Sequence, residues 1–132
     1  MRAQVSIELI IIIIILVSVF SFLITTISGR ENEFLSTRTT LHAKDVAENV
    51  AFSINEVFLA GENTTRKIAI PVTLRGNVPY NITYYENARL LYISYEANNY
   101  SVPLLTSNIT GVFTKGDINI SYVNGGINIA NG

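Results

Sequence analysis

The stretch Gln4-Val5-Ser6-Ile7-Glu8-Leu9, which runs directly into six isoleucines at 10–15, decides the fold of this chain. Residues 5–27 contain a single ionisable side chain, that of Glu8. As an α-helix this segment would be about 35 Å long at about 1.5 Å per residue, which is enough to cross the hydrocarbon core of a bilayer. We therefore expect an apolar N-terminal helix that crosses a membrane or is covered by other helices.

Glu8 is a carboxylate placed in an otherwise apolar helix. Burying a charge in hydrocarbon costs about 2.5–3.5 kcal/mol on insertion scales, so a partner is expected. In one interpretation that partner is a free α-amine created at Gln4 of a neighbouring subunit. In another, Glu8 is stabilised by the positive end of its own helix dipole or by the amine of its own chain. A position at the membrane edge is the third interpretation, and the residues alone leave all three open.

The three residues Met1-Arg2-Ala3 form a very short leader. A secretory signal places its small-residue cleavage site after the apolar run, whereas here the small residue, Ala3, precedes it. A cut after Ala3 would leave the apolar helix on the mature protein. Arg2 favours a cytoplasmic N-terminus.

A second helical stretch is predicted from about residue 31 to residue 60. Its apolar residues recur at spacings of three and four and form one stripe: Leu35, Ala43, Val46, Ala47, Val50, Ala51, Ile54, Val57 and Phe58. Ser28-Gly29 would bend or interrupt the join with the first stretch, or the helix is continuous. Gly61 is the expected C-terminal stop.

After Gly61 the apolar period changes from 3.6 to 2, which predicts strands. We expect strands at 67–74, 81–85, 90–95, 100–104, 109–114, 118–123 and 127–130. Pro71, Pro79 and Pro103 should lie at strand edges or starts. The predicted fold class is α+β: a long N-terminal α-helix, apolar and then amphipathic, followed by an antiparallel sheet or small sandwich.

Composition excludes several functions. The net charge is −1, which argues against nucleic-acid binding, and the absence of cysteine excludes disulfides and Cys-ligated metals. His42, the single histidine, is interpreted as a surface or interface residue rather than a metal ligand. The sequence has no phosphate-binding loop and no nucleophile motif, so we expect no catalytic residues, no cofactor and no metal.

The Gln-x-Ser-x-Glu-Leu motif at 4–9, directly after a very short leader, resembles archaeal type IV pilins with a class III signal peptide. The resemblance implies that a prepilin peptidase cuts between Ala3 and Gln4 and that Glu8 acts in subunit docking. It further implies a type IV pilin-like layout in which the helix forms the filament core and a β-rich head faces outward. The implied partners are other copies of the chain in a helical filament, the prepilin peptidase, the pilus assembly platform, and the membrane before assembly.

Five Asn-x-Ser/Thr sequons follow Gly61, at Asn63, Asn81, Asn99, Asn108 and Asn119. They are candidates for N-glycosylation on an extracellular head. Residues i and i+2 of a strand share a face, so a polar strand face also produces Asn-x-Thr without any modification. Seven tyrosines also lie in this part, and we favour packing on β faces over an adhesive surface.

The expected organisation is a leader at 1–3, an apolar membrane or filament-core helix at 4–29, an amphipathic helix at 30–61 and a β-rich extracellular head at 62–132. The expected function is that of a structural subunit of an archaeal type IV pilus, a surface adhesion filament. Its expected location is the cell membrane before assembly and the extracellular pilus afterwards. The alternative is a minor pilin-like or single-pass membrane-anchored surface binding protein.

Overall fold

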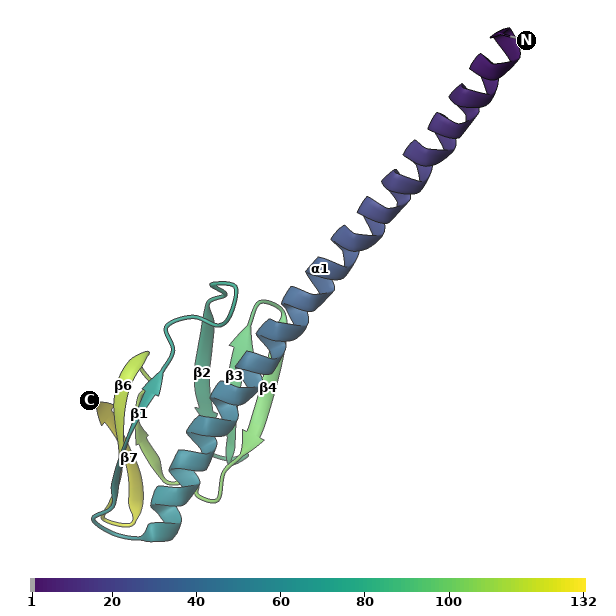
Figure 1. Ribbon diagram of the computed structural model, residues 1–132. Coiled ribbons are helices and arrows are strands. Elements are labelled where there is room, and N and C mark those ends of the chain that lie inside the picture. The colour runs from purple at the N-terminus through teal and green to yellow at the C-terminus, as the bar shows by residue number, and fades with distance from the viewer. Residues whose placement is uncertain (1) are drawn as a thin grey trace. The chain divides into compact units, whose positions relative to one another are not determined.

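The computed structural model describes residues 2–132, apart from the side chains of residues 2–5 and 32. The chain forms two compact units, Met1–Thr37 and Arg38–Gly132, and each is described by itself. One long helix is followed by seven strands (Figure 1), so the α+β class expected from the sequence is confirmed. This layout is consistent with a pilin-like fold.

Helix α1 spans Arg2–Ala60. It continues through Ser28 and Gly29, so the interruption considered there does not occur. The helix ends where expected, because Gly61 adopts a φ of 91° and its amide donates to the Val57 carbonyl at 3.3 Å. Glycine adopts this left-handed conformation without steric cost, which explains why the helix stops there.

All seven predicted strands are present; 90–95 has the predicted bounds and the other six have shifted ends. The strands are β1 (Thr65–Ile70), β2 (Tyr80–Tyr85), β3 (Leu90–Tyr95), β4 (Asn98–Pro103), β5 (Ile109–Gly111), β6 (Gly116–Val123) and β7 (Gly126–Asn131). The largest differences are at β1, expected to reach residue 74, and β5, expected to reach residue 114. β1 stops directly before Pro71, which has no amide hydrogen to donate to a ladder. Pro79 directly precedes β2 and Pro103 ends β4, so the prolines lie at strand ends as expected.

The strands form two sheets. One sheet has the order β1-β6-β7-β5 and the other the order β2-β3-β4. One pairing departs from the expected antiparallel arrangement, because β5 pairs with β7 in parallel. Strand β7 forms an antiparallel hairpin with β6 and then takes the position between β6 and β5, which brings it beside a strand of its own direction.

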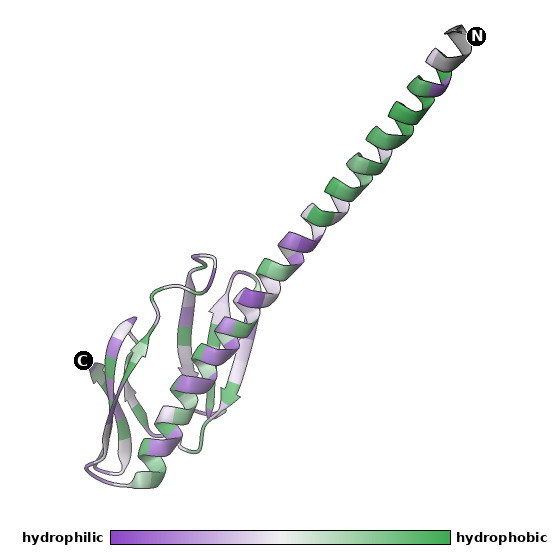
Figure 2. Ribbon diagram, in the orientation of Figure 1, coloured by the Kyte–Doolittle hydropathy of each residue, from purple (hydrophilic) through white to green (hydrophobic). Residues whose placement is uncertain are grey.

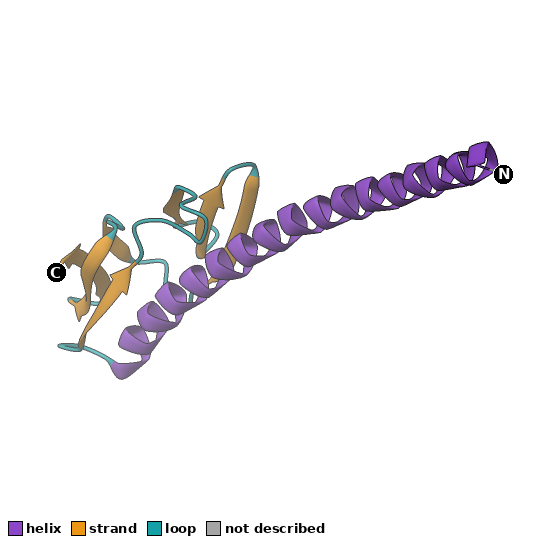
Figure 3. Cartoon of the chain, turned by 45° about the horizontal axis from the view of Figure 1, so that its top comes forward, coloured by secondary structure: helices purple, strands orange, loops and turns teal. Residues whose placement is uncertain are grey.

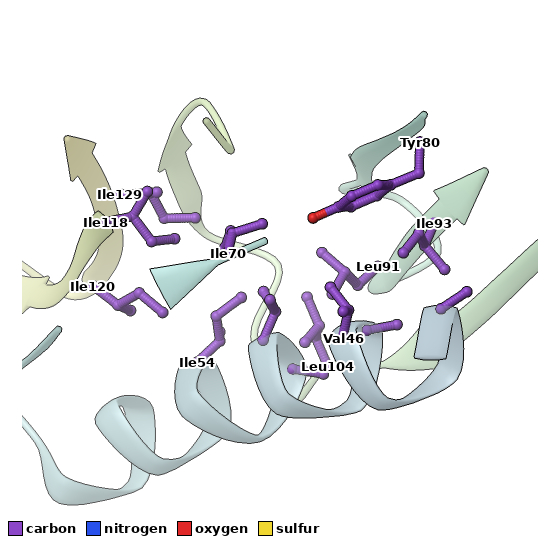
Figure 4. Close-up of a cluster of buried hydrophobic side chains, with 14 of the residues drawn as sticks. Val46, Ile54, Ile70, Tyr80, Leu91, Ile93, Leu104, Ile118, Ile120 and Ile129 are labelled. Carbon is purple, nitrogen blue, oxygen red and sulfur yellow. The ribbon is translucent and has the colours of Figure 1, made fainter. Parts of the chain in front are cut away.

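The core of the Arg38–Gly132 unit lies between α1 and both sheets (Figures 3 and 4). The helix contributes a fully buried stripe that includes Ala43, Val50 and Ile54. The three-stranded sheet contributes Leu91 and Ile93, and the four-stranded sheet contributes the buried isoleucines Ile118, Ile120, Ile127 and Ile129. The amphipathic helix expected at 30–61 therefore belongs to the head unit from Arg38 onward. Leu35, expected on the same stripe, is 57% exposed because the packed part of the helix begins later.

The connection between β1 and β2 is hydrogen-bonded to the helix at Arg75. The Arg75 amide donates to Nδ1 of His42 at 3.0 Å, and the Thr39 hydroxyl donates to the Arg75 carbonyl at 3.0 Å. Because Nδ1 accepts a hydrogen bond, the His42 ring carries its proton on Nε2. His42 is thus a structural residue of the head.

Substituting Gly111 with alanine should destabilise the head by about 2–4 kcal/mol. Gly111 has a φ of 105°, and a Cβ there would lie 2.1 Å from the Ile129 carbonyl oxygen of the neighbouring strand. Thermal unfolding of the full chain in detergent, followed by circular dichroism, measures the loss. Gly29→Ala is the matched control, because Gly29 lies in the helix with no atom within 4 Å of the added methyl group. An unfolding temperature for Gly111→Ala equal to that of the control would contradict the close approach of β5 and β7.

Tyr80 should make the head sensitive to alkaline pH. Its hydroxyl donates to the Pro71 carbonyl, its side chain is 3% exposed, and burial raises its pKa to about 12. The unfolded chain releases this proton near pH 10, so the stabilisation is complete below pH 10 and is lost as the pH rises towards 12. Tyr80→Phe should lower stability at neutral pH by about 1 kcal/mol and make the decline between pH 10 and pH 12 shallower. Urea unfolding at a series of pH values measures both effects, and parallel curves for the two proteins would refute the assignment.

Candidate functional site

The most prominent functional feature of the Met1–Thr37 unit is an uncovered apolar surface. From Ile7 to Ile27 the large apolar side chains are between 48% and 73% exposed. Figure 2 shows this part of α1 in nearly continuous green, whereas the helix residues of the head alternate in colour. A helix that is apolar on all sides is stable only inside a membrane or an assembly. Within the described residues, α1 is the one helix long and apolar enough to cross a membrane.

Three hydroxyl side chains of the apolar segment have their hydrogen bonds inside the helix. The hydroxyls of Ser18, Thr25 and Thr26 donate to the carbonyls four residues earlier at 2.8–2.9 Å. An unsatisfied hydroxyl is costly in an apolar environment, and these bonds remove that cost. The segment is therefore compatible with hydrocarbon or with closely packed neighbouring helices.

Glu8 is exposed and lies within α1. Positions 4 and 8 are one helical turn apart and share a face of the helix. The predicted cleavage pair, Ala3 and Gln4, belongs to the residues whose side chains are outside the description. The cut and the pairing of Glu8 with the Gln4 amine therefore stay predictions.

The structure distinguishes the five candidate glycosylation asparagines. Asn63, Asn81, Asn99 and Asn108 are exposed, and Asn119, on the central strand β6, is partly exposed. The Asn108 side chain is hydrogen-bonded, because its Nδ2 donates to the Gly125 carbonyl at 3.1 Å. The backbone N–H of Asn108 donates to the Thr106 hydroxyl, also at 3.1 Å. That structural role had no signal in the sequence, since it depends on the β6–β7 turn folding back beside residue 108.

Most of the tyrosines of the head pack, as the sequence analysis favoured. Tyr80 and Tyr95 are buried, and Tyr122 packs edge-on against Phe58. Tyr84 donates to the Ser107 carbonyl at 2.7 Å. Tyr100 donates to the Glu48 carboxylate at 2.9 Å, and this hydrogen bond raises the pKa of Tyr100. Tyr85 and Tyr92 differ, because they lie together on the outer face of the three-stranded sheet.

In the described part of the chain, no group of three His, Cys, Asp or Glu side chains is placed to hold a metal ion. No family model, curated protein or solved structure matches the chain. Function is therefore argued from the apolar helix, from Glu8 and from the surface of the head.

A membrane-spanning role of the apolar helix is tested by placing charge in it, which should weaken insertion in a graded way. The sixteen large apolar residues between Ile7 and Ile27 contribute about 0.3–0.6 kcal/mol each, together about 5–10 kcal/mol. One lysine costs about 3 kcal/mol, so Leu16→Lys should remain in the membrane. Adding Ile12→Lys and Phe20→Lys on the same face should release the protein from membranes washed with alkaline carbonate. Methionine at the same three positions is the control, and retention of the triple lysine variant would contradict a membrane-spanning role.

Proposed function

We propose that this protein is a structural subunit of an archaeal type IV pilus. The chain is inserted as a single-pass precursor, cut between Ala3 and Gln4 by a prepilin peptidase, and polymerised through α1. The observation that carries the proposal is the uncovered apolar surface at residues 7–27, which begins beside Glu8. The confirmed layout, a long helix followed by a β-rich head, supports it.

The apolar surface suits two environments in succession. Before assembly, lipid tails surround the helix; in the filament, the helices of other copies take their place. Lipid tails are as apolar as leucine side chains, so the exchange has little hydrophobic driving force of its own. Assembly therefore depends on close packing, on specific polar contacts and on the pilus assembly platform. Ser18, Thr25 and Thr26, with their hydroxyls turned back onto the helix, permit such packing.

Glu8 supplies the specific polar contact in this proposal. The cut after Ala3 creates an α-amine at Gln4, and an incoming subunit places that amine beside Glu8 of a subunit already in the filament. Opposite charges attract strongly where water is excluded, so the pair fixes the axial position of each new helix. Removing one member leaves a buried charge without a partner, which costs about 3–5 kcal/mol.

The mature N-terminus tests the processing step directly. Mass spectrometry of the protein isolated from cells should give a chain beginning at Gln4, with or without cyclisation of that residue. Cyclisation would consume the amine, so an uncyclised Gln4 is the form the docking role requires. A mature protein that retains Met1-Arg2-Ala3 would overturn the proposal and leave a membrane-anchored surface protein.

Glu8→Ala should leave the protein in the membrane but lower the yield of sheared surface filaments at least tenfold. The reason is that the Gln4 amine of each incoming subunit loses its partner. Electron microscopy and the amount of subunit in the sheared fraction measure the yield. Glu31→Ala is the matched control, since it removes a carboxylate that follows the apolar run.

Normal filaments from Glu8→Ala would contradict the docking role.

The sheared fraction also tests the assignment as a bulk subunit. A protein that forms the bulk of the filament dominates this fraction, whereas a minor pilin-like subunit is present only in traces.

A further inference from the structure

The outer face of the β2-β3-β4 sheet is polar and aromatic. Along each strand, residues that point towards the core alternate with exposed or partly exposed ones. The outward set consists of Asn81, Thr83, Tyr85, Leu90, Tyr92, Ser94, Asn99, Ser101 and Pro103. Two of the five sequons, Asn81-Ile82-Thr83 and Asn99-Tyr100-Ser101, therefore share this face.

The strand register places the two sequons symmetrically about the central strand β3. Asn81 and Asn99 both lie opposite Ser94, one on each side. Thr83 and Ser101 likewise lie opposite Tyr92, one on each side. Adjacent strands are about 4.8 Å apart, so the two asparagines are about 10 Å apart with Tyr92 diagonal to both.

Both asparagines are available for chemistry. They are exposed, and within the described part of the chain neither side chain makes a hydrogen bond. Asn108 contrasts with them, because its Nδ2, the atom that a glycan would occupy, already donates to the Gly125 carbonyl.

An aromatic hollow adjoins the sequons on the same face. The Tyr85 and Tyr92 rings meet edge to face with their centroids 4.9 Å apart. With Glu86, Asn87 and Ala88 they line a hollow of about 330 Å³. This volume lies at the small end of the range for ligand sites. Tyr85 remains 56% exposed, so the hollow opens to the surroundings of the head.

We propose that this face carries two N-linked glycans, at Asn81 and Asn99, and that Tyr92 and Tyr85 form the platform on which their sugars pack. The sugar donor is a lipid-linked oligosaccharide, used by a membrane oligosaccharyltransferase. The Asn Nδ2 attacks the anomeric carbon of the first sugar, and a C–N bond forms. The bond from that carbon to the lipid phosphate breaks, the lipid phosphate leaves, and a base of the transferase takes the Nδ2 proton.

The two tyrosines give the attached sugars a defined place. The C–H bonds of a sugar ring carry partial positive charge and meet the negative face of an aromatic ring favourably. Because Tyr92 is diagonal to both asparagines, the first sugars of either glycan reach it, and later sugars reach the hollow beside Tyr85. The Glu86 carboxylate and the Asn87 amide at the hollow offer hydrogen bonds to sugar hydroxyls.

The inference rests on the proposed function only in requiring that the head lie outside the cell. Glycosylation does not require filament formation, so an experiment can contradict one of the two proposals without contradicting the other. A Glu8→Ala protein that does not polymerise but stays in the membrane should still carry both glycans.

Intact-mass measurement of the protein isolated from its own cells tests the sites. Asn81→Gln and Asn99→Gln should each remove one glycan mass, and the double variant should remove both. Asn108→Gln is the matched control and should leave the glycan mass unchanged. The site assignment would be overturned if the protein carried no glycan or if neither Asn81→Gln nor Asn99→Gln changed its mass.

A thermodynamic cycle tests the platform. Removing both glycans by the double Asn→Gln substitution should lower the unfolding temperature of the wild-type head by about 2–5 °C. In a Tyr92→Ala background the same removal should have no effect, whereas Tyr92→Phe, which keeps the ring, should behave as wild type. An equal change in all three backgrounds would overturn the platform and would leave the glycans without a contact at Tyr92.

Discussion

The apolar helical surface at residues 7–27 is unfavourable in water, and this constraint determines the environments in which the protein is stable. Sixteen large apolar side chains on all sides of one helix are stable only against lipid or against other helices. Three hydroxyls of this helix, those of Ser18, Thr25 and Thr26, donate to its own carbonyls, which lowers the cost of placing them in an apolar environment. A carboxylate is unusual in such an apolar surface, so Glu8 is the carboxylate of the chain to which we assign a specific contact.

A second constraint operates inside the head, where the same helix is a structural layer. The two sheets are separate ladders, and the buried helix residues between Ala43 and Val57 pack against both. Three of these residues are alanines, Ala43, Ala47 and Ala51, and all three are almost completely buried. Without α1, each sheet would expose one apolar face, so the head is not a domain of strands alone. With no cysteine in the chain, this packing provides the stability that many small extracellular domains obtain from disulfides.

Much of the fold was predictable because it is encoded locally. Alternation of apolar residues located every strand, and Gly61 marked the end of the helix, since both signals depend only on neighbours in sequence. The parallel pairing of β5 with β7 was missed because a strand's own pattern does not state which strand will lie beside it. The engagement of Asn108 by Gly125 and the alignment of Asn81, Ser94 and Asn99 depend on the same long-range register. The sequence thus identified the sequons but not which of them share a face.

Protection of the sheet edges is one reason why sequons would occupy the edge strands β2 and β4. Four described strands lie at sheet edges, and an unprotected edge invites pairing with another chain. β1 carries Lys67, which pairs with Asp117 at 2.9 Å, and β5 is only three residues long. Both features are recognised defences of an edge. β2 and β4 are each six residues long with no charged side chain, and Pro103 protects only the last position of β4. Their outward asparagines, Asn81 and Asn99, are where a glycan would block pairing. In the proposed filament many heads would lie close together, so protection of the edges would matter more there than for an isolated molecule.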